Sequence, residues 1–134
     1  TGFILDYHEH EASSIELARE VLANFDYNQS QIDTVVDLIE VTHPKARPVN
    51  KMQAILKDAD LDYLGRSDFM AVSESLFKEL QEHNGMMSEQ EWNKRQCDFI
   101  SGHKYYTETA RKMRQMNKEM QLEKLKLVSK NAAV

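Results

Sequence analysis

The sequence predicts an all-α fold, a helical bundle that ends in a long C-terminal helix, and three observations support it. Apolar residues recur at intervals of three and four along most of the chain, which is the spacing of one helix face. A capping residue precedes each of these runs. With 134 residues and 41% hydrophobic content, the chain is long enough for one domain with its own core. We therefore expect a single helical domain of five main helices over residues 1–134.

Capping boxes predict the first two helices. One covers about residues 13–25, and the second ends near His43, because Pro44 disfavours helical geometry in the residue before it. The capping pairs are Ser13 with Glu16 and Ser30 with Asp33, and Tyr27 and Asn28 separate the two helices.

The third helix is predicted to begin at Asn50 with Gln53 and to end at Gly65. The fourth begins at Ser67, with Gly85 as a candidate terminator. Apolar residues of all the helices are expected in one common core: Leu17, Val21, Val36, Ile39, Ile55, Leu56, Leu76 and Phe99.

The last helix is predicted to run without a break from Ser88, capped with Glu91, to about residue 127, since Gly102 is the only glycine within it. Its apolar residues at intervals of seven are Trp92, Phe99, Tyr106, Met113, Met120 and Leu127. A homodimer through this helix is one interpretation of that spacing, but the companion positions are mostly polar. The favoured interpretation packs the first half on the domain and lets residues 118–134 project or fray.

Composition excludes several classes of protein. A formal charge of −5 gives no basic surface for a nucleic-acid polymer. The single cysteine, Cys97, cannot form an internal disulfide, and no apolar run approaches the roughly 18 residues that span a bilayer. We therefore expect a cytoplasmic protein with no membrane partner. The abrupt apolar beginning TGFILDY suggests a fragment.

Three aspartates, Asp58, Asp60 and Asp62, interrupt the apolar pattern of the third helix. On a helical wheel Asp60 lies about 65° from the centre of the apolar side, nearer than the other two. A carboxylate at the edge of a core needs a cation or hydrogen bonds, so a metal ligand and a helix-flank salt bridge are both open interpretations. A calcium loop does not fit, because Tyr63 and Phe69 occupy its glycine and glutamate positions.

Histidines are the natural partners for such a carboxylate. His8 and His10 lie in the segment HEHE, and His43 ends the second helix. Imidazole and carboxylate ligands from separate helices suit a divalent ion such as Mn, Fe, Mg or Zn. Each histidine also has a simpler interpretation, either as a solvated residue or, for His43, as a cation at a helix C-terminus.

The segments TGFILDYHEHEASSIELAREVL, LIEVTHP and ILKDADLDYLGRSDF together resemble HD-domain proteins, the metal-dependent phosphohydrolase superfamily. The resemblance covers most of the chain and implies an all-α bundle that uses a divalent metal to activate water against a phosphoester, commonly in a nucleotide. It implies that Asp60, which follows Ala59, is a metal ligand.

The sequence departs from the family pattern at the first histidine and the His-Asp pair, which it lacks. In relatives of this type the His-Asp pair stands directly before a TGF-like segment. Thr1 therefore resembles the residue that follows this pair in the family. The resemblance then leaves Asp60 as a metal ligand and His10 as a further ligand or phosphate contact. Candidates for supporting the ligands or contacting substrate are Glu11, Thr42, His43 and Asp58.

Two functions are therefore expected from the sequence. The first is a phosphohydrolase that acts on a small phosphorylated substrate such as a nucleotide, with an incomplete metal site in this chain alone. The alternative is a non-catalytic helical module for sensing or scaffolding.

Overall fold

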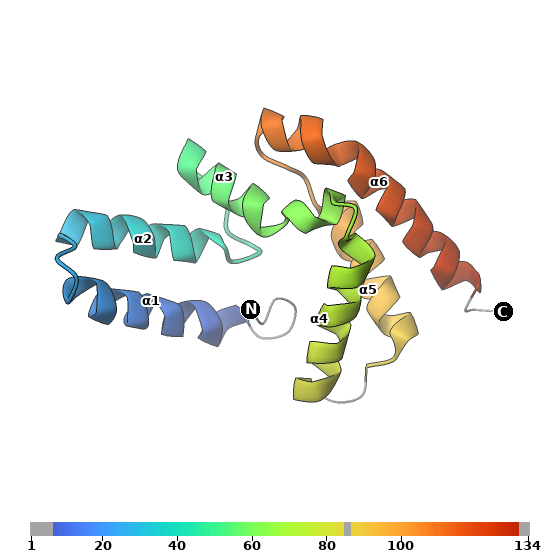
Figure 1. Ribbon diagram of the computed structural model, residues 1–134, viewed down its shortest axis with the longest axis horizontal. Helices are drawn as coiled ribbons and strands as arrows, with labels where there is room; N and C mark the ends of the chain where they lie inside the picture. Colours follow the sequence, from blue (N-terminus) through green and yellow to red (C-terminus); the bar gives the residue numbers. More distant parts are fainter. Residues whose placement is uncertain (1–6, 85–86, 132–134) are drawn as a thin grey trace. The chain divides into compact units, whose positions relative to one another are not determined.

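The computed structural model describes residues 7–84 and 87–131, and every regular element in these ranges is helical. Six α-helices and one 3-10 helix follow one another, with no strand between them in the described part (Figure 1). The all-α prediction is confirmed. The chain divides into two compact units, an N-terminal unit of residues 1–60 and a C-terminal unit of residues 61–134. Each is described by itself.

The N-terminal unit has three helices, α1 (Tyr7–Ala23), α2 (Gln29–Val41) and α3 (Lys51–Asp60). Helices α1 and α2 lie side by side (Figure 1), joined by a turn in which Asp26 has a φ of 60°. Among the described residues of this unit, the buried apolar ones belong to α2 and are Ile32, Val36 and Val41.

The start of the first two helices differs from the prediction. Helix α1 is already helical at Tyr7, so Ser13 lies in its interior and does not cap it. Helix α2 is capped by Asn28, whose side chain accepts a hydrogen bond from the N–H of Gln31 (3.0 Å). The Gln31 side chain in turn accepts from the Asn28 N–H (2.9 Å). This capping box, which begins two residues before Ser30, gives hydrogen-bond partners to the N–H groups of Asn28 and Gln31.

Helix α3 begins as predicted, because the Asn50 side chain accepts a hydrogen bond from the N–H of Gln53 (2.9 Å). It ends at Asp60, earlier than the predicted stop at Gly65, and a 3-10 helix η1 follows over Asp62–Gly65. Asp58 and Asp60 therefore lie in the last turn of α3, while Asp62 opens η1.

The C-terminal unit consists of η1, α4 (Phe69–Asn84), α5 (Glu89–Gly102) and α6 (Glu108–Asn131). Helix α4 starts two residues after the predicted Ser67, and the predicted terminator Gly85 lies outside the described residues. The capping box of Ser88 and Glu91 at the start of α5 is confirmed. One core cluster joins η1, α4, α5 and α6, and its buried members are Leu64, Phe69, Ile100 and Leu125.

The prediction of one uninterrupted last helix is wrong. Helix α5 ends at Gly102, and His103 takes an extended conformation with φ −78° and ψ 137°. Helix α6 begins at Glu108. The hydroxyl of the preceding residue, Thr107, accepts a hydrogen bond from the N–H of Ala110 (3.2 Å). The break is held by side chains of α6 that bond to the carbonyls of residues 103–106, which a periodicity argument does not detect.

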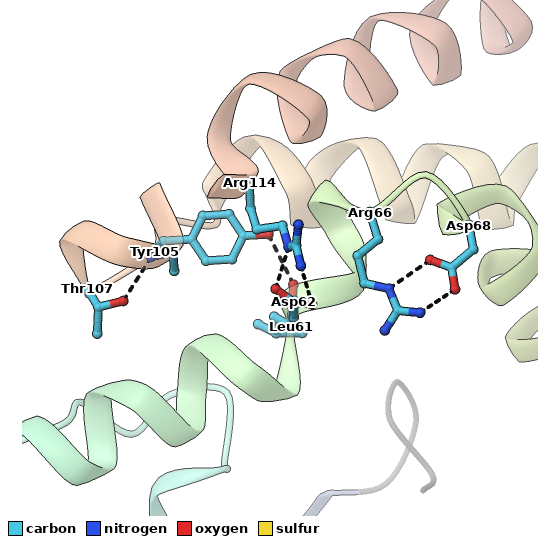
Figure 2. Close-up of polar contacts among 8 residues, drawn as sticks. Leu61, Asp62, Arg66, Asp68, Tyr105, Thr107 and Arg114 are labelled. Atoms are coloured by element: carbon cyan, nitrogen blue, oxygen red, sulfur yellow. Dashed lines mark hydrogen bonds and ion pairs between the residues drawn. The ribbon is translucent and has the colours of Figure 1, made fainter. Parts of the chain in front are cut away.

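Contacts with η1 and the residues beside it hold α6 and the segment before it in place (Figure 2). Arg114 pairs with Asp62, and the Tyr105 hydroxyl donates to the carbonyl of Leu61 (3.2 Å). Farther along α6, the Gln121 amide donates to the carbonyl of Arg66 (3.3 Å). The expectation that residues from 118 onward project is therefore corrected, since Lys118, Gln121 and Leu125 are buried.

Val36 is buried, as the common-core prediction requires, but it lies in the core of the N-terminal unit only. The prediction is wrong for four residues, which are exposed. The exposed fractions are 61% for Leu17, 39% for Val21, 51% for Ile55 and 39% for Phe99. A helical wheel assumes that every helix turns its most apolar face to one shared core. The chain instead divides into two units, and the face that each helix buries depends on its neighbours in that unit.

Candidate functional site

All six candidate residues from the sequence belong to the N-terminal unit. Two lie in α1, two follow α2 and two lie in the last turn of α3; they are His10, Glu11, Thr42, His43, Asp58 and Asp60. The arrangement of the ends of these helices therefore decides which of them can act together.

Asp60 is the last residue of α3. The residue as a whole is exposed, but its carboxylate is partly desolvated. This desolvation raises the pKa of Asp60 above its usual value, the positive charge of Lys57 opposes the rise, and the negative charge of Glu11 adds to it. Asp60 thus lies within electrostatic reach of a cation on its own helix and of a carboxylate on α1.

Glu11 contributes the second carboxylate. Its side chain is half-buried, and its Oε2 atom is buried with no hydrogen-bond partner among the described residues. A desolvated carboxylate oxygen without a partner is costly unless a proton or cation offsets its charge. Glu11 on α1 and Asp60 on α3 are thus two acidic groups whose charges interact, and Lys57 opposes their effect at Asp60.

Lys57 lies one turn before Asp60 on α3 and is 7% exposed. Its ammonium donates to the carbonyls of His43 (2.9 Å) and Ala46 (2.6 Å), so it ties the loop after α2 to α3. Burial lowers the pKa of Lys57, while the charge of Asp60 raises it. The sequence analysis missed this residue, although its spacing of three from Asp60 on a helix placed it on the same face.

Thr42 and His43 shape that loop. The Thr42 hydroxyl donates to the carbonyl of Ile39 (2.7 Å) at the end of α2. His43 Nδ1 accepts a hydrogen bond from the N–H of Lys45 (3.2 Å). Both contacts are local and stabilise the turn, and a role of these two residues at a site stays a prediction. Asp58 is buried, with 5% of its surface exposed.

His10 is exposed, and its backbone carbonyl accepts a hydrogen bond from the Ser14 hydroxyl (2.8 Å). Within the described part of the chain, no hydrogen bond or ion pair joins its imidazole to Asp60. The structure therefore brings Asp60 together with Glu11 and Lys57, and a shared site of Asp60 with His10 stays a prediction. The side chain of His8 lies outside the described residues.

The described residues contain no group of three or more His, Cys, Asp or Glu side chains arranged to hold a metal ion. None of their helices combines the length and apolar character that crossing a bilayer requires. No protein-family model, curated protein or solved structure matches this chain.

Proposed function

We propose that this chain is the helical core of a metal-dependent phosphohydrolase of the HD superfamily, acting on a small phosphoester such as a nucleotide. One observation carries the proposal. The carboxylates of Asp60 on α3 and Glu11 on α1 interact electrostatically in a partly desolvated setting, and a Glu11 oxygen lacks a partner in the described structure. Two such groups repel each other, and a divalent cation is the ligand that offsets this repulsion most directly.

The donor set fits a hard or intermediate ion such as Mn, Fe, Mg or Zn. We assign Asp60 as a ligand, with His10 as a further ligand or phosphate contact. When bound, such an ion supplies Lewis-acid stabilisation of charge on the phosphoryl oxygens.

The remaining residues have supporting roles in this proposal. The negative charge of Glu11 adds to the attraction for a cation. Lys57 fixes the loop that carries Thr42 and His43 through its bonds to two loop carbonyls, and its charge limits the repulsion at Asp60. Asp58 is buried in the same turn as Asp60, and we assign it no more than a supporting position there.

The proposal assigns this chain an incomplete site. Catalytic metal sites keep about three protein ligands and one open position. The first histidine and the His-Asp pair of the family pattern are not in this sequence, which leaves at most two recognised ligands. We therefore expect weak binding of divalent metal and no useful rate of hydrolysis from these 134 residues alone.

Titration with Mn²⁺, followed by paramagnetic broadening of backbone amide NMR signals, tests the assignment. We expect weak binding that broadens signals near Asp60 and Glu11 and that Asp60→Asn weakens at least about tenfold, as for loss of a charged ligand. Asp37→Asn, which removes an exposed carboxylate of α2, is the matched control. Unchanged binding by Asp60→Asn, or broadening confined to other acidic residues, would contradict the metal assignment and leave the non-catalytic helical module as the better account.

A further inference from the structure

Exposed apolar residues continue at intervals of seven across the break between α5 and α6. Phe99 is 39% exposed, Tyr106 43%, Met113 58%, Met120 51% and Leu127 61%. In one continuous helix this spacing would place all five residues in a single stripe. In the observed structure the stripe is interrupted: Phe99 lies on α5, Tyr106 lies in the break at residues 103–107, and the other three residues lie on α6.

The break itself is made by residues that can also form a helix. The segment 103–107 contains neither proline nor glycine. Lys118 donates to the carbonyl of His103 (2.7 Å), and Arg111 donates to the carbonyls of Tyr105 and Tyr106 (both 3.1 Å). In a continuous helix, backbone N–H groups four residues later would bond to the same carbonyls. These carbonyls therefore have two alternative sets of donors.

The inner face of α6 fits a site formed by the rest of the C-terminal unit. Arg114 pairs with Asp62 of η1, and Gln121 donates to the carbonyl of Arg66. Leu125 completes the core cluster. A second copy of the chain carries the same α6 and can make the same contacts. The site can therefore be occupied by α6 of its own chain or by α6 of the other copy.

We propose that two copies of this chain form a domain-swapped dimer. Residues 103–107 become helical, α5 and α6 merge into one helix, and α6 of each copy occupies the site of the other. The merged helix gathers Phe99, Tyr106, Met113, Met120 and Leu127 into one stripe, which gives the dimer an apolar contact surface that the separate chain lacks. This assembly is independent of the proposed metal chemistry, because it uses only the C-terminal unit.

Lys104→Pro tests the continuous helix directly. His103 already has the extended conformation that a following proline requires, and no hydrogen bond of the Lys104 N–H is found in the described structure. The substitution is therefore compatible with the break, but proline inside a merged helix would remove a hydrogen bond and clash with the preceding turn. Lys104→Ala is the matched control, since it removes the same charge and keeps the N–H.

Light scattering after size-exclusion chromatography gives the oligomeric state. We expect the wild type and Lys104→Ala to form dimers that increase with concentration and after refolding at high concentration, and Lys104→Pro to remain a folded monomer. Dimerisation by Lys104→Pro at the wild-type level would overturn the proposal. So would a wild type that stays monomeric at every concentration up to its solubility limit.

A mixing experiment separates exchange of α6 from simple association. Asp62→Arg and Arg114→Asp each break the ion pair between η1 and α6 within a chain. In a swapped heterodimer of the two variants, Arg114 of one chain faces Asp62 of the other, and Asp at 114 faces Arg at 62, so both pairs are restored. Native mass spectrometry of the co-refolded mixture should show heterodimers above their statistical share. A statistical share or less would overturn the exchange.

Discussion

Arg114 on α6 binds Asp62 in η1 through two parallel contacts, from Nε to Oδ1 (2.6 Å) and from Nη2 to Oδ2 (3.3 Å), as Figure 2 shows. The pair is partly exposed, with 26% of the arginine and 32% of the aspartate side chain accessible. The hydrogen bond with Asp62 raises the pKa of Arg114 above its usual value. Asp62 is one of the three aspartates that interrupt the apolar pattern of the third predicted helix, and its role in the structure is to join η1 to α6.

These elements also approach each other tightly at Gly65, at the end of η1. A Cβ added to Gly65 would lie 2.6 Å from Cβ and 2.9 Å from the carbonyl carbon of Arg114. Gly65→Ala should therefore force η1 and α6 apart and lower the free energy of unfolding by about 2 kcal/mol, in the range of other overpacking changes. Urea unfolding followed by circular dichroism measures this loss.

Gly102→Ala is the matched control for that substitution. A Cβ at Gly102 meets no atom within 4 Å, and alanine has a higher helix propensity than glycine. Its free energy of unfolding should be unchanged or slightly raised. If Gly65→Ala were as stable as wild type, the close packing of η1 on α6 would be wrong.

A buried polar chain links α4 to α5. The indole N–H of Trp92 donates to the Ser73 hydroxyl (3.2 Å), which donates to Oε1 of Gln96 (2.6 Å). Ser73→Ala would leave both neighbours without this partner, so we expect a loss of about 1 to 3 kcal/mol. Since Trp92 is the only tryptophan, its fluorescence should shift in the folded variant and report the change. Ser75→Ala on the exposed side of α4 is the control, and equal stability of the two variants would refute the prediction.

Some local contacts were predictable from the sequence, although Ser13 and Ser30 do not cap the first two helices, and contacts between distant segments were not predictable. Asn50 with Gln53, and Ser88 with Glu91, form hydrogen bonds within three residues, so the pattern of residue types is sufficient to find them. The break between α5 and α6 depends on Lys118 bonding to a carbonyl fifteen residues away. No propensity or periodicity of residues 103–107 contains that information.

The same contrast applies to the candidate site. The wheel placed Asp60 nearer the buried side of α3 than Asp58, but Asp58 is buried, while Asp60 and the apolar Ile55 are exposed. The helix therefore buries a different face from the one that the wheel assumed, although the carboxylate of Asp60 is partly desolvated. The relation of Asp60 to Glu11 arises from the packing of the N-terminal unit. Lys57 was overlooked because lysine is rarely buried, and here two loop carbonyls compensate its burial.

Lys57→Met tests the importance of that compensation. Methionine keeps much of the stem but leaves the carbonyls of His43 and Ala46 without their donor, so the free energy of unfolding should fall by about 1 to 3 kcal/mol. Thermal unfolding measures the loss, and Lys51→Met, at an exposed position of the same helix, is the control. A variant as stable as wild type would show that water replaces the ammonium at little cost.

The pH dependence of stability gives the most direct test of the pair formed by Asp60 and Glu11. The pKa of Asp60 is raised by desolvation and by the charge of Glu11, with Lys57 opposing. Because its pKa is higher in the folded than in the unfolded state, the folded protein binds more protons between these two values, and the free energy of unfolding falls as pH rises through that window. The stability that the protonated form contributes is complete below the unfolded-state pKa, near 3.8.

Asp60→Asn should remove this contribution to the pH dependence, because asparagine resembles the protonated carboxyl and does not titrate. At neutral pH the variant should be more stable than wild type by less than about 1 kcal/mol, since solvent screens a partly exposed group. Urea unfolding at a series of pH values measures the difference between the two proteins, with Asp37→Asn as the control for an exposed carboxylate. The difference should grow as pH rises above the unfolded-state value. A variant less stable than wild type at neutral pH would mean that the charge of Asp60 stabilises the fold through Lys57, and that its repulsion from Glu11 is too weak to favour a cation.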